Sequence, residues 1–263
     1  MNTLRSSLVA LLIVAGFNST AQNGPWNGKQ CAVALTYDDA IDVDLDNAIP
    51  ALDSLGLKGT FYLIGSSPAI ARRIPEWRKA AANGHELGNH TSFHPCNGQL
   101  PGRSFVRPDN DLARYTLSRM TAETRFTNTL LQSIDGKTER TFAFPCGDKK
   151  IGDTPYYDAV KMDFVAARGV RGGMQTASEV DLSDIECYMI NGQNADYMID
   201  LVKKARQTHT LLVFLFHGVG GGHNINVDLR EHSKLLHYLK EQEKEIWIAP
   251  MVDIAKYISS SRK

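Results

Sequence analysis

The chain has too few cysteines and too little net charge for several classes of protein. Four cysteines in 263 residues cannot build a fold from disulfides, so a hydrophobic core has to supply the stability. Lysine and arginine together number 29, as do aspartate and glutamate, and this balance offers no electrostatic footprint for nucleic acid or an anionic membrane. Hydrophobic residues make up 43% of the chain and charged residues 22%, which excludes a disordered, collagen-like or coiled-coil protein.

The chain also lacks an apolar run long enough to cross a membrane. The N-terminal run, residues 8–17, has ten residues, and about 30 Å of hydrocarbon requires roughly 20. Arg5 precedes this run, and Ser19, Thr20 and Ala21 offer small residues for cleavage. The pattern predicts a signal peptide over residues 1–21, a mature domain over 22–263, and a periplasmic or secreted location where disulfides can form.

Short apolar runs alternate with segments of helical spacing along the rest of the chain. We expect strands at 31–37, 59–64, 86–88, 140–144, 164–167, 210–216 and 245–248, and helices at 46–55, 69–82, 111–133, 154–162, 195–206, 229–241 and 252–259. Such alternation predicts parallel strands joined by crossover helices. With no linker and no repeat, it indicates a single α/β domain, a distorted (β/α) barrel of about seven strands. The sequence does not indicate an oligomeric state.

Two adjacent acids, Asp38 and Asp39, directly follow the first expected strand. Catalytic residues of such barrels lie at the carboxyl ends of strands. Because side chains alternate in direction along a strand, one carboxylate could bind a cation while the other moves protons. The plain alternative is an acidic turn or helix cap.

Three histidines complete this candidate site. His90 and His94 are four residues apart, a spacing that suits two imidazoles on one metal ion if the segment forms a helical turn. With one carboxylate they make a three-ligand set with open positions, the pattern of catalytic zinc, although cobalt and nickel fit the same ligand types. His217 ends the most apolar strand and precedes a glycine-rich stretch, which favours a reactive group over a buried core histidine.

Four motifs in this order resemble the polysaccharide deacetylases, the carbohydrate esterase group that includes the nodulation-factor and chitin deacetylases. They are LTYDDA (35–40), HTSFH (90–94), FAFPCG (142–147) and VFLFH (213–217), and the tail over 246–258 resembles the family's closing strand and helix. The resemblance implies a metal-dependent hydrolase that removes acetyl groups from an acetylated glycan by N-deacetylation. The alternatives are an O-acetyl xylan esterase, a hydrolase of small non-sugar amides and a non-catalytic glycan-binding relative.

The resemblance also assigns roles. Asp38 matches the general base and His217 the general acid, and the metal ligands are Asp39, His90 and His94, with zinc expected and cobalt or nickel as alternatives. Pro145 and Cys146 match the motif whose backbone N–H helps to hold the oxyanion. Tyr37 flanks the first motif and is a candidate for contact with the sugar, as are Phe93 and Phe144, although core packing is the alternative for all three.

The sequence departs from the family pattern at two positions. An arginine that steadies the catalytic acid is often found where Ala143 stands, and Arg168, with Arg171 in reserve, is our candidate replacement because it follows an expected strand. The family's acid-with-tryptophan motif is not recognisable, and Asp181 and Asp184 lie roughly where it would fall.

The cysteines and the remaining histidines complete the predictions. Cys96 and Cys146 each stand beside a motif expected at the metal, so we hypothesise that they form a disulfide, although four cysteines allow three pairings. Cys31 and Cys187 are expected to be buried as small hydrophobes. His223 is interpreted as an exposed loop residue, with a place in the substrate groove as the alternative.

Overall fold

The computed structural model describes residues 24–262, so the predicted signal peptide lies outside the described residues. Its main sheet contains eight strands in parallel register: β1 (Cys31–Asp38), β2 (Thr60–Leu63), β3 (Glu86–Asn89), β4 (Phe142–Ala143), β7 (Ala167–Arg168), β8 (Tyr188–Met189), β9 (Leu211–Phe216) and β12 (Ile246–Ile248). Seven of them run in the order β7-β4-β3-β2-β1-β9-β8, and β12 pairs with the first half of β1. A bridge between Arg168 and Ile185 joins β7 to the segment before β8. The sheet therefore curls into the expected distorted barrel.

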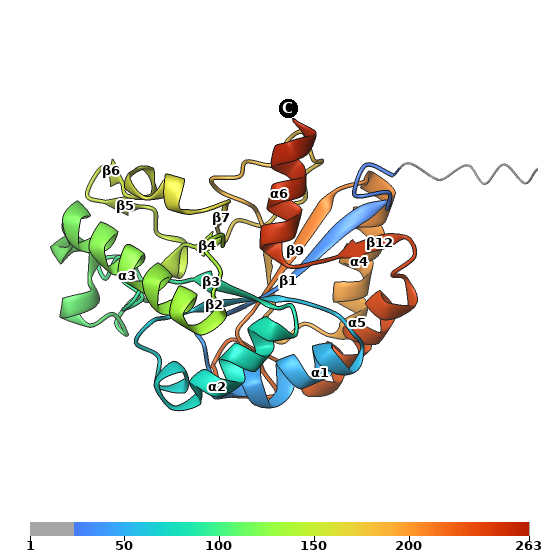
Figure 1. The fold of residues 1–263 in the computed structure, drawn as a ribbon, viewed down its shortest axis with the longest axis horizontal. Helices are drawn as coiled ribbons and strands as arrows, with labels where there is room; N and C mark the ends of the chain where they lie inside the picture. The colour runs from blue at the N-terminus through green and yellow to red at the C-terminus, as the bar shows by residue number, and fades with distance from the viewer. Residues whose placement is uncertain (1–23, 263) are drawn as a thin grey trace, which may run out of the picture.

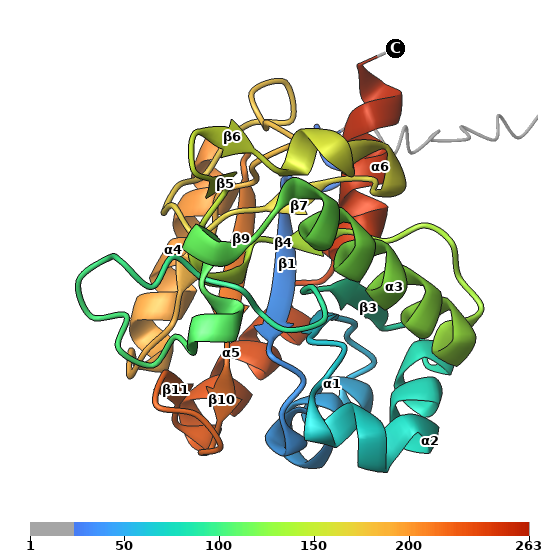
Figure 2. The same ribbon diagram turned by 90° about the vertical axis from the view of Figure 1, so that its left-hand side faces the viewer.

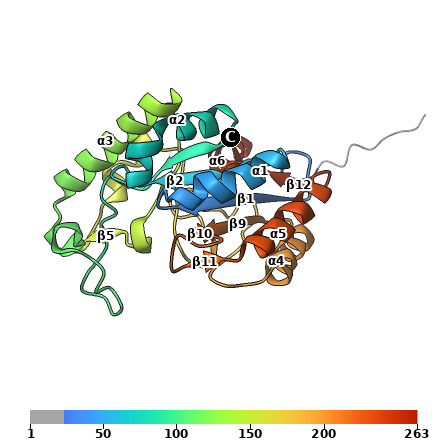
Figure 3. The same cartoon turned by 90° about the horizontal axis from the view of Figure 1, so that it is seen from below.

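Six α-helices pack around these strands. They are α1 (Ile49–Ser54, preceded by a π-helical turn η1, Asp44–Ala48), α2 (Pro68–Ala82), α3 (Leu117–Asp135), α4 (Ala195–Thr208), α5 (Leu229–Glu241) and α6 (Met251–Ser261). Figure 2 shows α1 to α5 arranged around β1, and Figure 3 shows the pair α2 and α3 on one flank with α4 and α5 on the other. The side chains of Ser67, Thr116, Asn194 and Asp228 cap α2, α3, α4 and α5 by accepting backbone N–H groups.

Shorter elements lie in the connections. They are the strand pairs β5 (Lys150–Ile151) with β6 (Thr154–Pro155) and β10 (Gly218–Val219) with β11 (Asn226–Val227), and the 3-10 turns η2 (Pro108–Asn110), η3 (Leu112–Arg114), η4 (Pro145–Gly147), η5 (Tyr157–Ala159) and η6 (Lys161–Asp163). Among residues 24–262, no helix has the length and apolarity needed to cross a bilayer.

The central strands are buried on both faces, and their residues alternate between two cores. Val33, Leu35 and Tyr37 of β1 pack with the surrounding helices. Ala32 and Ala34 instead pack with Leu215 and Ile254 on the side covered by α6. This alternation turns Asp38 toward the interior of the barrel, whereas its neighbour Tyr37 points away from it.

One end of the barrel is closed by α6, the last helix of the chain (Figure 1). The Met251 N–H donates to Thr60 Oγ1 at 2.8 Å and the Val252 N–H to Glu86 Oε2 at 2.9 Å. Thr60 and Glu86 begin β2 and β3, so α6 covers the amino ends of these strands. The carboxyl ends lie at the opposite rim, where a ligand can enter.

The expected elements are largely present, with four differences. The helix expected at 154–162 is wrong: β6 and the turns η5 and η6 occupy it, because Tyr156 and Tyr157 pack into an aromatic cluster with Phe142 and Phe144. The long helix expected from residue 111 begins at Leu117, since the Asp111 side chain caps the separate turn η3. The strand expected at 164–167 is β7, which shares only residue 167 with that range because Phe164 packs into the same aromatic cluster. The short strand β8 was not expected.

Candidate active site

The carboxyl ends of four strands bring the predicted site residues together. Asp38 ends β1, His90 follows β3, Arg168 ends β7 and His217 follows β9. A pocket of about 360 Å³ opens at this rim, within the size range of small-molecule sites. Its lining includes six of the residues to which the sequence assigned a role at the site: Asp38, Asp39, His90, His94, Cys146 and His217.

Asp39, His90 and His94 form a compact group of metal-ligand type. Asp39 Oδ1 lies 3.6 Å from Nε2 of His90 and 3.6 Å from Nε2 of His94. His90 Nδ1 donates to the Ala143 carbonyl oxygen at 2.9 Å, which leaves the Nε2 lone pair facing Asp39. Within residues 24–262, the buried Asp39 Oδ1 has no hydrogen-bond partner. Two imidazole nitrogens and an orphaned carboxylate oxygen are the donor set that a divalent transition metal requires.

Burial keeps both histidine rings uncharged, as metal binding requires. It lowers the pKa of His90 to about 3 and that of His94 to about 4, against a partial opposing effect of the Asp38 charge. Both rings are therefore neutral at physiological pH, as metal ligands must be. Burial raises the pKa of Asp39, and a cation placed between the three groups would offset that effect.

Asp38 is held by a buried arginine. Arg168 Nη2 donates to both carboxylate oxygens of Asp38, at 2.6 and 2.5 Å, and both side chains are almost completely buried. Burial alone would raise the pKa of Asp38, but the Arg168 guanidinium outweighs it and the pKa lies below the usual range. Of the two arginines considered as replacements for the one missing at Ala143, Arg168 is the one that contacts Asp38. Arg171 instead pairs with Glu186 and its side chain is 69% exposed.

His217 and His223 face each other across the same pocket. Their rings stack with centroids 4.8 Å apart, and Nε2 of each approaches Asp39 Oδ2, at 3.9 Å from His217 and 3.7 Å from His223. Burial lowers the pKa of His217, and the Asp38 and Asp39 charges oppose this shift. The interpretation of His223 as an ordinary exposed loop residue is wrong, because the Gly220–Gly222 stretch, with φ positive throughout, folds it back into the pocket.

Backbone strain concentrates at these motifs. Of the seven described non-glycine residues with positive φ, five lie in or beside them: Asp39, Ala40, Thr91, His94 and Cys146. Each such conformation costs on the order of 1–3 kcal/mol. The strained backbone therefore lowers the stability of the fold at the positions that orient these side chains, which is typical of functional sites.

A family model described as polysaccharide deacetylase matches residues 27–166, which is more than half of the chain. This chain belongs to the polysaccharide deacetylase family. A peptidoglycan-N-acetylglucosamine deacetylase of Bacillus cereus is 42% identical over 79 residues, 28% of this chain and 26% of that protein. A gellan lyase of a Bacillus species is 28% identical over 153 residues, 58% of this chain but 5% of that protein. The matches thus span only a small part of either relative.

Solved structures show the polysaccharide deacetylase fold over almost the whole described chain. A Mycobacterium smegmatis protein assigned as a polysaccharide deacetylase superposes with a TM-score of 0.62 at 14% identity, covering 89% of this chain and 92% of its own. A variant of the peptidoglycan deacetylase PdaC from Bacillus subtilis gives 0.53 at 14% identity, covering 89% and 93%. The fold and the family are therefore established, and the family removes acetyl groups from polysaccharides.

Several sequence predictions about this deacetylase-family site need correction. Tyr37 does not reach the pocket: it is fully buried, its hydroxyl hydrogen-bonds His232 Nε2 at 2.8 Å, and its ring stacks on Phe61 and Phe216. The alternation along β1 explains this, since Asp38 takes the inward position. Asp184 pairs with Lys149, and Asp181 accepts the Ser183 N–H, so neither lines the pocket.

Other wall residues carry no sequence signal. Arg103 and Phe105, from the long loop after the second motif, line the pocket together with Val170 and Met189. Phe144, a candidate from the sequence, also lines the pocket and packs in the aromatic cluster with Phe142 and Tyr156. Arg103 donates to the Cys146 carbonyl oxygen at 3.2 Å, which fixes the loop against the third motif. Phe93 is 46% exposed and lies outside the pocket lining. A polar loop of this kind shows no periodicity from which its pocket-facing residues could be read.

The hypothesised disulfide is confirmed. Cys96 and Cys146 are bonded, with Cα atoms 5.8 Å apart, and so tie the loop of the second motif to the turn of the third. Cys31 and Cys187 are free and buried, as expected.

Proposed function

We propose that this chain is a metal-dependent hydrolase that removes N-acetyl groups from an acetylated carbohydrate. The observation that carries the proposal is the convergence of Asp39, His90 and His94 beside the Asp38–Arg168 pair and His217 in one pocket. A divalent ion held by the first three residues would polarise the acetyl carbonyl and lower the pKa of a water to about 7. The His₂–Asp donor set favours zinc and also suits cobalt or nickel.

Asp38 is the proposed general base. Its lowered pKa keeps it ionised at neutral pH, and Arg168 fixes its orientation and compensates its buried charge. Asp38 accepts a proton from the attacking water, a function that contributes roughly 10²–10⁴-fold to the rate in enzymes generally. Arg168 touches no reacting atom in this scheme and acts by positioning Asp38.

His217 is the proposed general acid, and Cys146 supplies the oxyanion contact. His217 would protonate the departing amine, with Asp38 and Asp39 stabilising its charged form against the effect of burial. The Cys146 N–H would donate to the oxyanion that develops on the acetyl carbonyl, and Pro145 shapes that turn. One such donor is worth about 2.7–4 kcal/mol in known enzymes. The apolar walls formed by Phe144 and Leu215 suit a methyl group.

The cellular setting is part of this proposal. The pattern of residues 1–21 predicts export, and a confirmed disulfide beside the site fits an oxidising compartment. The near-neutral charge of the chain fits a neutral glycan. We therefore propose a periplasmic or secreted enzyme that acts on an extracellular acetylated glycan.

Acetate release from two substrates tests the proposal. We expect the zinc-loaded enzyme to release acetate from N-acetylated chitooligosaccharides faster than from acetylxylan. Release from acetylxylan alone would show an O-acetyl esterase on the same site. Release from neither would favour a non-catalytic glycan-binding relative.

A further inference from the structure

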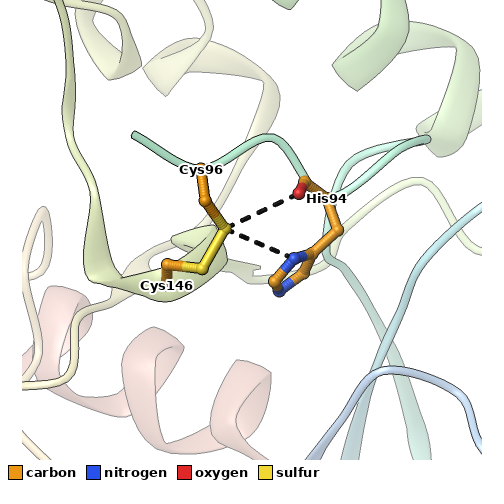
Figure 4. A group of neighbouring side chains, drawn as sticks. All are labelled: His94, Cys96 and Cys146. Atoms are coloured by element: carbon orange, nitrogen blue, oxygen red, sulfur yellow. Dashed lines mark hydrogen bonds between the residues drawn. A yellow bond between two sulfur atoms is a disulfide. The ribbon is translucent and has the colours of Figure 1, made fainter. Parts of the chain in front are cut away.

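The Cys96–Cys146 disulfide lies directly against one of the proposed metal ligands. Cys96 Sγ is 3.5 Å from Nδ1 of His94, and Figure 4 shows the imidazole turned toward the sulfur atoms. The other ring nitrogen, Nε2, faces Asp39 Oδ1 at 3.6 Å. His94 therefore presents one nitrogen to the disulfide and the other to the proposed catalytic metal set.

His94, Cys96 and Cys146 form a second group of metal-ligand type, next to the group of Asp39, His90 and His94. The ligand atoms of His94, Cys96 and Cys146 lie within 4.8 Å of one another. While the disulfide is intact, neither sulfur can act as a thiolate ligand. Reduction with a phosphine adds two electrons and two protons to the sulfurs, and the phosphine takes an oxygen atom from water to become its oxide.

We propose that reduction of the Cys96–Cys146 disulfide creates a second metal site, in which both thiolates and Nδ1 of His94 bind a thiophilic divalent cation such as Zn²⁺ or Cd²⁺. Each thiol loses its proton to solvent as the metal binds. Two sulfur atoms and one imidazole nitrogen match the soft ligand preference of these ions, with solvent completing the coordination. The Cα separation of 5.8 Å already brings the two side chains to one point.

The two sites compete for a single lone pair. A neutral imidazole has one protonated nitrogen and one free lone pair. In the oxidised protein, Nδ1 of His94 faces a disulfide sulfur, which can accept a hydrogen bond but cannot donate one. The imidazole proton therefore belongs on Nδ1, and the lone pair on Nε2 faces Asp39. A metal bound by the thiolates requires the opposite tautomer. This competition rests on the proposed function, whereas the thiolate site itself does not.

Reduction can act only on this cysteine pair, because the other two cysteines of the chain are already free thiols. Cys146 lines the pocket, so a small reductant can reach its sulfur. Cys31 and Cys187 are fully buried elsewhere in the core. They are present in every form of the protein and therefore serve as an internal control for thiolate signals.

Cobalt titration tests the thiolate site without measuring activity. The protein is reduced with a phosphine, freed of reductant under anaerobic conditions and titrated with Co²⁺. We expect a thiolate-to-cobalt charge-transfer band in the near ultraviolet from the reduced protein. The oxidised protein and the Cys96→Ser/Cys146→Ser double variant should bind Co²⁺ without this band. Co²⁺ binding by the oxidised protein and by the double variant tests the proposed Asp39–His90–His94 ligand set independently.

Three results would overturn the inference. They are absence of the band after reduction, an equal band in the reduced double variant, and loss of the folded far-ultraviolet dichroism on reduction. If the double variant does not fold, the oxidised protein, which carries no thiolate at this place, is the reference. Because His94 belongs to both proposed sites, His94→Gln is judged by the charge-transfer band: it should weaken the Co²⁺ binding that this band reports by more than the roughly 10–100-fold typical of losing an outer-sphere partner.

Discussion

At the scale of single residues, the buried Asp38–Arg168 pair dominates the behaviour of the site. Both side chains are shielded from water, so neither charge can be compensated by solvent if the other is removed. The sequence pointed to Asp38 through its place after a strand and to Arg168 through the same rule. Which of the two nearby arginines pairs with the acid depended on their side-chain directions, which alternate along an extended chain.

Replacing Arg168 tests this pairing. We expect Arg168→Gln to lower the free energy of unfolding by about 3–5 kcal/mol, because it leaves Asp38 buried without its partner. Arg168→Lys keeps the charge but not the guanidinium geometry, so it should fold and lose mainly kcat. Arg171→Gln, at an exposed position, is the matched control and should change neither quantity. Urea denaturation and steady-state kinetics of the three variants provide the comparison; equal effects at 168 and 171 would disprove the pairing.

His223 provides a second residue-scale prediction. Its Nδ1 accepts the Ile225 N–H at 3.0 Å, which leaves the proton on Nε2, facing Asp39 Oδ2. We expect His223→Ala to weaken zinc binding about 10–100-fold, as the loss of an outer-sphere partner does. His223→Phe keeps the ring that stacks on His217 and should weaken zinc binding equally while preserving that packing. Calorimetric titration with zinc measures this, and wild-type affinity in the alanine variant would exclude the role.

At the scale of elements, helix α3 supports the loop that carries both proposed histidine ligands. Asn89 Nδ2 donates to the Thr124 carbonyl oxygen at 2.9 Å, and Ser92 Oγ donates to the Glu123 carbonyl oxygen at 3.0 Å. The expected one-turn helix over 90–94 is replaced by an irregular loop in which Thr91 and His94 have positive φ. The histidine spacing therefore predicted the convergence of the two rings, but the loop produces it through contacts with α3.

The buried carboxyl of Glu123 on α3 gives a pH prediction. Burial raises its pKa to about 7, against the Tyr115 hydroxyl and the Arg119 charge, which lower it. The folded state then holds a proton that the unfolded chain releases near pH 4.5, so this group's contribution to stability falls as pH rises from about 4.5 to 7. Relative to wild type, Glu123→Gln should gain about 1–3 kcal/mol of unfolding free energy between pH 4.5 and 8.

Urea denaturation at several pH values measures this gain. Glu241→Gln, on an exposed position of α5, is the control and should give the same difference from wild type at every pH. A difference for Glu123→Gln that does not grow with pH would show that the carboxyl is ionised in the folded protein.

At the scale of the whole molecule, the alternation of apolar runs and helical segments was enough to predict the curled parallel sheet. Strands β1 and β9 could be predicted from their length and apolarity, since a strand buried on both faces carries a continuous apolar run. The residues that close the barrel could not be predicted, because closure depends on two-residue strands and a single bridge between Arg168 and Ile185. These short pairings are set by tertiary contacts and leave no periodic pattern.

The central claim is that the pocket at the carboxyl ends of the strands performs metal-dependent deacetylation. The most direct test measures acetate released from an N-acetylated chitooligosaccharide by the protein as purified, after chelation and after zinc is restored. We predict that release stops on chelation and returns with zinc. Asp38→Asn should bind zinc normally, since Asp39, His90 and His94 are intact, and release acetate roughly 10²–10⁴-fold more slowly. Undiminished release after complete metal removal, or near wild-type release by zinc-loaded Asp38→Asn, would contradict the account.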